Sequence, residues 1–327
     1  MGNILTGLFA VVAGVGGALI LFWALNFLVD RVLPAKVGEP LKPWVYAGPA
    51  VLFIAVFLVY PAVTTIYTSF LDRSGQEFVG LANYTDLFQD GAFLSTLVNT
   101  LLWLLVVPAL SVVLGLLVAV LADRLSERWE KVSKSLIFLP MAISAVAAAT
   151  IWRFIYDYKP PGQEQTGLLN ALWTFFGGEP VVWLQMSQAK VNSLLLMVIL
   201  IWLQTGFCMV LLSAAIKNVP EETIEAARID GATELQAFFR VIVPQMWGTV
   251  LTVYVTVLIT VLKVFDIPYV MTNGNFDTNV IALGFFKELF EFGNDGRSAA
   301  IVVILLLAVL PVMIYQVRQF RKEEAMR

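Results

Sequence analysis

The chain has 327 residues, of which 59% are hydrophobic and only 14% are charged, whereas about 25% of residues are charged in a typical soluble domain. Mean hydropathy is +0.82, and several apolar runs are long enough to cross a bilayer, which excludes an ordinary soluble protein. The absence of histidine excludes histidine-based catalysis and histidine-bound metals, the single cysteine excludes an intrachain disulfide, and the net charge of −3 argues against nucleic acid as a partner.

Apolar segments along the chain predict an all-α integral membrane protein with about seven transmembrane helices. A helix needs about 20 apolar residues to cross a hydrocarbon core of about 30 Å. The first segment has no Lys or Arg before Arg31 and is too long for the apolar part of a signal peptide, so we expect it to be retained as a helix. The predicted spans are residues 4–29, 45–70, 95–122, 135–156, 193–216, 246–270 and 299–317.

The basic residues predict the orientation of these spans. Lys and Arg gather in alternate connections, with clusters around Arg128 and Arg321, and are sparse in the others. Because cytoplasmic loops of membrane proteins carry an excess of positive charge, we expect the N-terminus outside and the C-terminus in the cytoplasm.

The longest outer connection, about residues 157–192, contains two turn clusters, 160–162 and 177–180. Between them lie Trp173, Phe175 and Phe176. The pattern indicates a structured or interfacial loop that is too short to be an independent domain.

The cytoplasmic connection between spans five and six, residues 218–244, predicts two short helices. Pro220 suits the first position of a helix that runs to about Ile229. Asp230-Gly231 then allows a sharp turn, because glycine tolerates positive φ. Thr233, followed three residues later by Gln236, is a capping-box pattern that begins a second helix, which we expect Pro244 to end. A plain amphipathic connector is the alternative.

The same connection resembles the EAA loop of ABC-importer permeases. Glu225-Ala226-Ala227 is followed at the family's spacing by Gly231, and then by Val241, Val243 and Pro244, with Val where the family has Ile and Leu. The resemblance implies a coupling helix that docks in a cleft of a separate ATPase subunit, with Glu225 in polar contact and Gly231 setting the turn. The implied coupling residues are Glu225, Ala226, Ala227, Asp230 and Gly231.

The resemblance extends from about Trp44 to the C-terminus. The segment Phe78–Tyr84 resembles an outer-loop signature of carbohydrate permeases, and Val264–Asn275 is similar to α-glucoside permeases of the maltose type. Asn275 departs from the common Thr-x-Gly-Gly-Pro form. The implied organisation is an extra N-terminal helix and cytoplasmic linker, residues 1–43, before a six-helix permease domain, residues 44–327, with its coupling loop at 218–244.

Polar residues inside spans five and six suggest a substrate pathway. Thr249, Thr252, Thr256, Thr260 and Lys263 recur at helical spacing on one face of span six, and Gln204 lies near the centre of span five. The alternatives are threonines bonded to their own helix, a glutamine bonded to a neighbouring helix, and a lysine that snorkels. The resemblance implies sugar-contacting positions at Trp202, Thr205, Gly206, Met209 and Lys263. The predicted pathway residues are Trp202, Gln204, Thr205, Gly206, Met209, Thr256, Thr260 and Lys263.

No Gly-x-x-x-x-Gly-Lys-Ser/Thr phosphate-binding loop occurs in the chain, so we expect no ATP hydrolysis, no catalytic residues and no cofactor here. The resemblance implies that partner ATPase subunits bind ATP and Mg, that a second permease and an external solute-binding protein complete the importer, and that a di- or oligosaccharide crosses a bacterial inner membrane. Membrane lipid is the other expected contact.

The alternatives are a secondary active transporter for a small polar solute, which would usually show inverted repeats, and a seven-helix receptor or retinal protein, which would need a lysine in the last span.

Overall fold

In the computed structural model, residues 2–27, 29 and 35–325 are described. Their secondary structure is helical apart from one isolated bridge between Leu71 and Phe78, which confirms the all-α class. The chain divides into two compact units, Met1–Tyr67 and Thr68–Arg327. The sequence placed its boundary after residue 43, and that boundary stays a prediction.

Four helices are long and apolar enough to cross a membrane. Two further pairs of helices meet this criterion only together, because each pair is bent by more than 40° at a short break. The part of the chain that the structure describes therefore holds four spans, or six if each bent pair counts as one, and the expected number of seven stays a prediction. The four helices are Lys42–Thr68, Gly91–Asp123, Gln188–Lys217 and Asp295–Tyr315.

The first unit is a helical hairpin. Helix α1 (Gly2–Phe27) covers most of the predicted first span and contains no charged residue; residue 28 of that span lies outside the described residues. Helix α2 (Ala35–Ile54) packs on α1, and continues through the π-helical segment η2 (Ala55–Val59) into α3 (Tyr60–Thr68). The Tyr46 hydroxyl donates to Asn26 Oδ1 at 3.2 Å.

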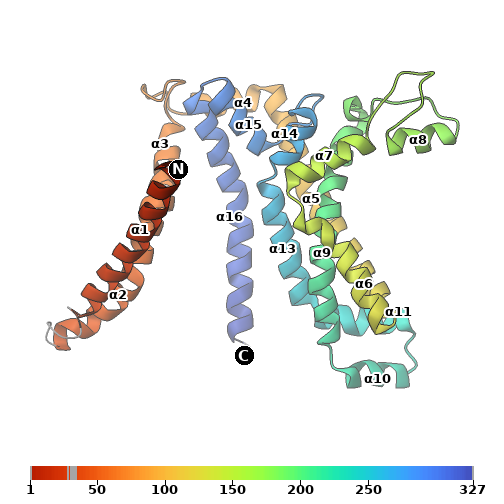
Figure 1. The fold of residues 1–327 in the computed structure, drawn as a ribbon, viewed down its shortest axis with the longest axis horizontal. Coiled ribbons are helices and arrows are strands. Elements are labelled where there is room, and N and C mark those ends of the chain that lie inside the picture. The colour runs from red at the N-terminus through yellow and green to blue at the C-terminus, as the bar shows by residue number, and fades with distance from the viewer. Residues whose placement is uncertain (1, 28, 30–34, 326–327) are drawn as a thin grey trace. The chain divides into compact units, whose positions relative to one another are not determined.

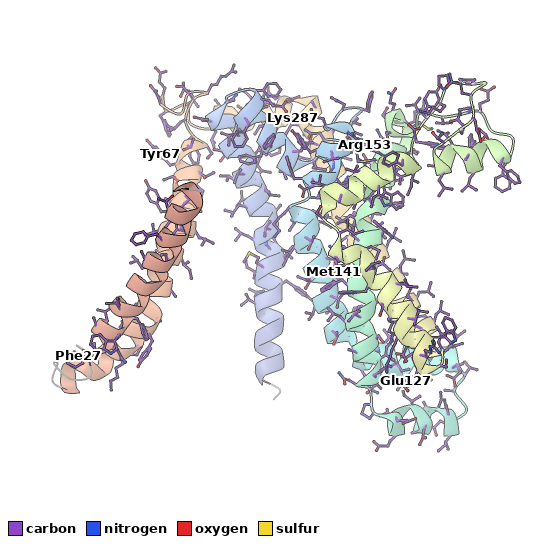
Figure 2. The ribbon with its side chains drawn as sticks, in the orientation of Figure 1. Phe27, Tyr67, Glu127, Met141, Arg153 and Lys287 are labelled. Carbon is purple, nitrogen blue, oxygen red and sulfur yellow. The ribbon has the colours of Figure 1, made fainter. Side chains whose placement is uncertain are left out.

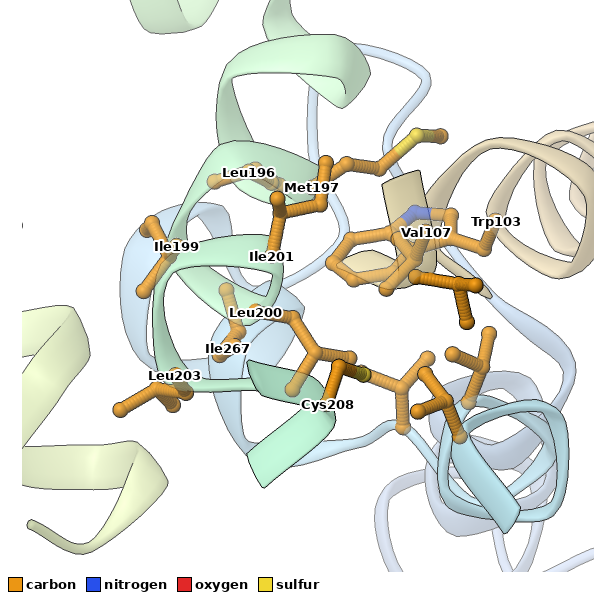
Figure 3. Close-up of a cluster of buried hydrophobic side chains, with 14 of the residues drawn as sticks. Trp103, Val107, Leu196, Met197, Ile199, Leu200, Ile201, Leu203, Cys208 and Ile267 are labelled. Carbon is orange, nitrogen blue, oxygen red and sulfur yellow. The ribbon is translucent and has the colours of Figure 1, made fainter. Parts of the chain in front are cut away.

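Two long helices, α5 (Gly91–Asp123) and α9 (Val191–Lys217), form the centre of the second unit. Helix α13 (Trp247–Leu262) packs against both of them. Figure 3 shows the core that they share, in which Trp103 and Val107 of α5 face Leu200 and Cys208 of α9. This bundle carries the helices from which the pathway was predicted.

Glycine lets the helices of this bundle approach closely. A Cβ atom at Gly115 of α5 would lie 2.4 Å from the Cys208 Cβ atom, and one at Gly206 of α9 would lie 2.5 Å from the Ile137 carbonyl oxygen. Membrane helices commonly associate through such small residues, because lipid offers no hydrophobic drive for packing.

The predicted span 135–156 is broken. Helix α6 (Glu127–Phe138) passes through the 3₁₀ turn η3 (Leu139–Ala142) and meets α7 (Ala145–Ile155) at 104°. Pro140 cannot donate a backbone hydrogen bond, and the Ser144 hydroxyl accepts from the Ala147 N–H at 3.2 Å, which starts a new helix. The segment is therefore two helices and not one straight helix, and its role as a single span stays a prediction.

The predicted span 246–270 also ends early. Helix α13 stops at Leu262, and a separate helix, α14 (Asp266–Thr272), follows. Lys263 is the residue after α13, with φ −104° and ψ 11°, and Phe265 before α14 is also non-helical. The expectation that Lys263 continues one face of the helix with Thr256 and Thr260 is corrected accordingly.

The two ends of the second unit differ in their elements (Figure 1). At one end lie α4 (Ala82–Gln89), α8 (Leu168–Phe175), α14 and α15 (Ile281–Phe286), together with the start of α16 (Asp295–Ala325). The opposite end carries α10 (Glu221–Ile229) and the last residues of α16. Figure 2 shows Arg153 and Lys287 at the first end and Glu127 at the second.

Candidate coupling segment and translocation pathway

Helix α10 begins directly after α9, with Pro220 as its N-cap residue rather than its first helical residue. Glu221 and Glu222 occupy its first turn and Arg228 its last turn. Carboxylates at the start and a cation at the end both interact favourably with the helix dipole, so the charge pattern of this segment matches its conformation.

The turn after α10 is a Schellman motif. The Gly231 N–H donates to the Arg228 carbonyl and the Ala232 N–H to the Ala227 carbonyl, both at 3.0 Å. Gly231 has φ +84°, and a Cβ atom there would meet no atom within 4 Å. Glycine is therefore required for backbone conformation and not for space.

A capping box starts the second helix, as predicted. The Gln236 N–H donates to the Thr233 hydroxyl at 3.3 Å, and the Thr233 N–H donates to the Gln236 side chain at 2.9 Å. The expected end at Pro244 is wrong by one residue, since α11 (Glu234–Ala237) continues through the π-helical segment η6 (Phe238–Ile242) into α12 (Val243–Gln245). Proline is tolerated there as an early residue of α12.

An ion pair braces the two helices across the turn. Arg228 donates from Nε to Glu234 Oε1 at 2.9 Å and from its terminal nitrogen to Oε2 at 3.2 Å. The hydrogen bond from Arg228 lowers the pKa of Glu234, and the same bond raises the pKa of the guanidinium. Backbone hydrogen bonds and a side-chain ion pair therefore both stabilise the turn.

The predicted coupling residues gather on this exposed segment. Glu225, Ala226, Asp230 and Gly231 are exposed, and Ala227 is half-buried. Ile229 beside them is 86% exposed.

A cluster of four charged residues joins the base of α9 to its neighbours. Glu130 Oε1 lies 2.5 Å from both Lys134 Nζ and Lys217 Nζ, and Asp123 Oδ1 lies 3.5 Å and 3.3 Å from the same two nitrogens. Glu130 is 15% exposed and Lys134 18% exposed. Since Lys217 is the last residue of α9, this cluster holds the point from which α10 departs.

The pathway residues on α9 fall into two groups. Trp202, Gln204 and Thr205 are half-buried, and the Trp202 ring lies edge-on to that of Trp152 with 5.9 Å between centroids. Gly206 and Met209 are buried among neighbouring helices. The structure therefore leaves partial access to the first group and places the second in interhelical packing; the role of both in transport stays a prediction.

The threonines of α13 bond their own helix. Thr252, Thr256 and Thr260 donate to the carbonyl four residues earlier, at 2.9, 2.8 and 3.1 Å. Each hydroxyl keeps its lone pairs as free acceptors. No hydrogen bond joins Gln204 to these threonines within the described ranges, so the pathway face expected on α13 stays a prediction.

A group of charged residues that the sequence did not predict lies at the opposite end from α10. Arg297 of α16 pairs with Asp90 before α5, and its Nε lies 3.0 Å from Glu288 Oε1. These three residues line a cavity of 210 Å³. Burial raises the pKa of Glu288; burial also acts upward on the pKa of Asp90, but bonds from the Ala92 N–H and Arg297 lower it overall. No local pattern signals the Arg297–Asp90 pair, whose members are 207 positions apart.

Residues 111–323 match the protein family described as "Binding-protein-dependent transport system inner membrane component". The chain is 46% identical over 336 residues to the "Alpha-glucoside transport system permease protein AglF" of Rhizobium meliloti (strain 1021), with 99% of each chain covered. It is 51% identical over 282 residues to the "Osmoprotective compounds uptake permease protein GgtC" of Synechocystis sp., with 86% of this chain and 100% of the relative covered.

A similar fold occurs in a solved bacterial ABC transporter involved in the import of the acidic polysaccharide alginate. The match has a TM-score of 0.74 at 21% identity and covers 88% of this chain and 99% of the other. A second structure of the alginate transporter, in complex with an alginate pentasaccharide-bound periplasmic protein, matches with a TM-score of 0.71 at 21% identity and covers 85% and 94%.

Proposed function

This chain belongs to the family of binding-protein-dependent transport system inner membrane components, and from that we propose that it moves a di- or oligosaccharide through an ATP-driven importer by alternating access. It is a multi-pass membrane permease subunit of an ABC importer, and a transport component rather than an enzyme. Membership of this family argues against the secondary active transporter considered from the sequence.

The observation that carries the proposed mechanism is the locked turn of the coupling segment. Helix α10 and the Schellman turn that follows it, up to Ala232, project beyond the bundle and are braced by the Arg228–Glu234 pair. A rigid exposed element can transmit the movement of a bound partner to the helices that carry it. We propose that partner ATPase subunits, which would bind ATP and Mg, grip this element, with Glu225 and Ile229 at the contact.

The sugar assignment rests on the relatives and on the half-buried polar groups of α9 and α13. A relative of 46% identity is named for α-glucosides. Gln204, Thr256 and Thr260 could exchange hydrogen bonds with sugar hydroxyls, with Trp202 as an aromatic wall. An osmoprotective compound is the second candidate, because a relative of 51% identity carries that description.

The proposed topology puts α10 in the cytoplasm and α8 outside. It follows the distribution of basic residues and gives an external N-terminus and a cytoplasmic C-terminus. A second permease chain would complete the pore, and an extracytoplasmic solute-binding protein would deliver the sugar to the outer end.

Reconstitution tests this function. The chain would be co-purified with a candidate second permease and candidate ATPase subunits, placed in proteoliposomes, and supplied with a candidate solute-binding protein. We expect ATP-dependent uptake of an α-linked disaccharide such as maltose, and no uptake without the binding protein. Preferred uptake of a zwitterionic osmolyte such as glycine betaine would favour the second candidate, and uptake without ATP would contradict both.

A further inference from the structure

The outer loop presents an apolar helix face that the transport mechanism does not use. Helix α8 exposes Leu168, Leu172, Phe175 and, one residue past its end, Phe176, at the i, i+4, i+7, i+8 spacing of a single face. The two phenylalanines are each 81% exposed. We call this set the α8 apolar face.

Polar groups occupy the inner side of the same helix. Asn170 is fully buried, and its amide nitrogen donates to the carbonyls of Asp157 and Val181, both at 3.0 Å. Its oxygen accepts from the Val181 N–H at 3.0 Å and the Trp183 indole at 2.9 Å. Leu169 also packs inward against the hydrophobic core, but with the amide of Asn170 buried and the large apolar side chains outside, α8 differs from a surface helix of a soluble protein.

The orientation of α8 is built into the loop. A Cβ atom at Gly167 would lie 2.2 Å from the Asp157 carbonyl oxygen, so only glycine allows the start of α8 to sit there. The Trp173 ring lies against Gly178 and edge-on to Trp183. Since the contacts on the inner side are satisfied, the α8 apolar face cannot turn inward without breaking the hydrogen bonds of Asn170.

A chain of contacts ties this loop to the end of a membrane-spanning helix. Asn170 bonds Trp183, the short helix around Trp183 packs on α9, and the Asn192 N–H at the start of α9 donates to the Met186 carbonyl at 3.1 Å. Helix α9 has 27 residues, so its length of roughly 40 Å exceeds the hydrocarbon by about 5 Å at each end. The start of α9 therefore lies at head-group depth, and α8 lies at the same end of the unit (Figure 1).

We propose that the α8 apolar face lies in the lipid head-group and acyl boundary and anchors the outer loop to the membrane surface. Helix α8 contains no charged residue, and the neighbouring carboxylates Glu164 and Glu179 stand in the turns before and after it. Aromatic and aliphatic side chains on a helix in the interface plane are the chemistry that a bilayer surface binds. A soluble protein partner would more often be met by a rim of charged and polar groups.

Depth-dependent quenching in the assembled transporter in lipid nanodiscs tests this. Phe175→Cys and, as the matched control, Gln163→Cys would each carry an environment-sensitive NBD probe in a Cys208→Ser background. Both positions are exposed in the same loop, but position 163 lies on the turn before α8. We expect the probe at 175 to emit further to the blue, to be quenched several-fold more by phosphatidylcholine with a doxyl group on acyl carbon 5, and several-fold less by iodide.

Three outcomes would overturn the proposal. Equal iodide quenching at 175 and 163 would place the face in water. Shielding of 175 that appears only after the solute-binding protein is added would assign the face to that protein, and shielding from both quenchers would mean that a permease partner covers it. If the cysteine variants do not assemble, a lipid-soluble diazirine on the unmodified transporter should label the α8 peptide, and failure to label it would count against the proposal equally.

Discussion

Gly231 holds a left-handed backbone in open space, so any substitution there acts through conformation. For Gly231→Val we expect strain of about 1–3 kcal/mol in the turn, normal insertion, and loss of sugar-stimulated ATP hydrolysis because α10 no longer presents the same surface. ATPase activity with and without substrate in proteoliposomes measures this.

The control for that variant is Gly162→Val. Gly162 has φ +88° and no atom within 4 Å of an added Cβ, so the local strain is the same, but it lies in the outer loop. Equal loss of coupling in both variants would reduce the effect to general destabilisation.

Gln204 and Thr260 are the half-buried polar side chains from which the pathway was inferred. Thr260→Val and Gln204→Leu keep the approximate shape and each remove the capacity for a hydrogen bond, which is worth about 0.5–1.5 kcal/mol. We therefore expect the apparent affinity for sugar in uptake assays to fall between a few-fold and about tenfold, with unchanged affinity of the binding protein.

Thr150→Val is the matched control for the α13 threonine, because Thr150 makes the same bond to the carbonyl four residues earlier, at 2.9 Å, on α7. Thr278 would be unsuitable, since it is fully buried and bonded to Thr272 at 2.6 Å. A similar loss at 150 and 260 would mean that helix packing, and not substrate, senses the hydroxyl.

At the scale of elements, the charge cluster around Glu130 links α5, α6 and α9 at the departure point of α10. Glu130→Gln leaves Lys134 and Lys217 with a weaker partner. The charge-assisted bond to Lys134 contributes about 1.5–3 kcal/mol, and the bond to Lys217, which is 52% exposed, contributes less because solvent screens it. We expect a lower melting temperature of the purified transporter and weaker coupling of ATP hydrolysis to uptake.

Helix α6 also supplies the control for this cluster. Glu127 pairs with Lys131 at 2.6 Å with the same i, i+4 spacing, but both side chains are more than 70% exposed, so Glu127→Gln should change stability by less than about 0.5 kcal/mol. Equal melting temperatures for the two variants would contradict the assigned role of the cluster.

The contrast between local and distant signals also explains what the sequence could predict. The α10 turn was predictable because Gly231, Thr233 and Gln236 act within a few residues of one another. The break before α7 was missed because a hydropathy pattern reads straight through the bend, although Pro140 and the Ser144 cap are local signals of it. The Arg297–Asp90 pair spans 207 positions, and only the packing of α16 beside the start of α5 brings it together.

At the scale of the whole molecule, the structure puts α8 and α10 at opposite ends of one unit (Figure 1). In whole cells that carry Cys208→Ser, we expect a membrane-impermeant maleimide to modify Glu164→Cys and to leave Glu225→Cys unmodified until the cells are opened. The reverse pattern would invert the proposed topology, and modification of both would mean that a span is miscounted. Reporter fusions at residues 1 and 327 test the termini in the same way.

Helix α7 has eleven residues, a length of about 17 Å that cannot cross about 30 Å of hydrocarbon alone. It packs on α14, and Arg153 donates to the Val270 carbonyl of that helix, a partner made more than a hundred residues later. During synthesis on the ribosome, α7 is therefore made well before α14, the helix on which it packs. Until α14 is made, we expect α7 to remain unpacked near the translocation channel. Nascent chains arrested shortly after Lys217 should leave position 153 open to chemical modification, whereas those arrested near Arg327, where α14 has left the ribosomal tunnel, should protect it.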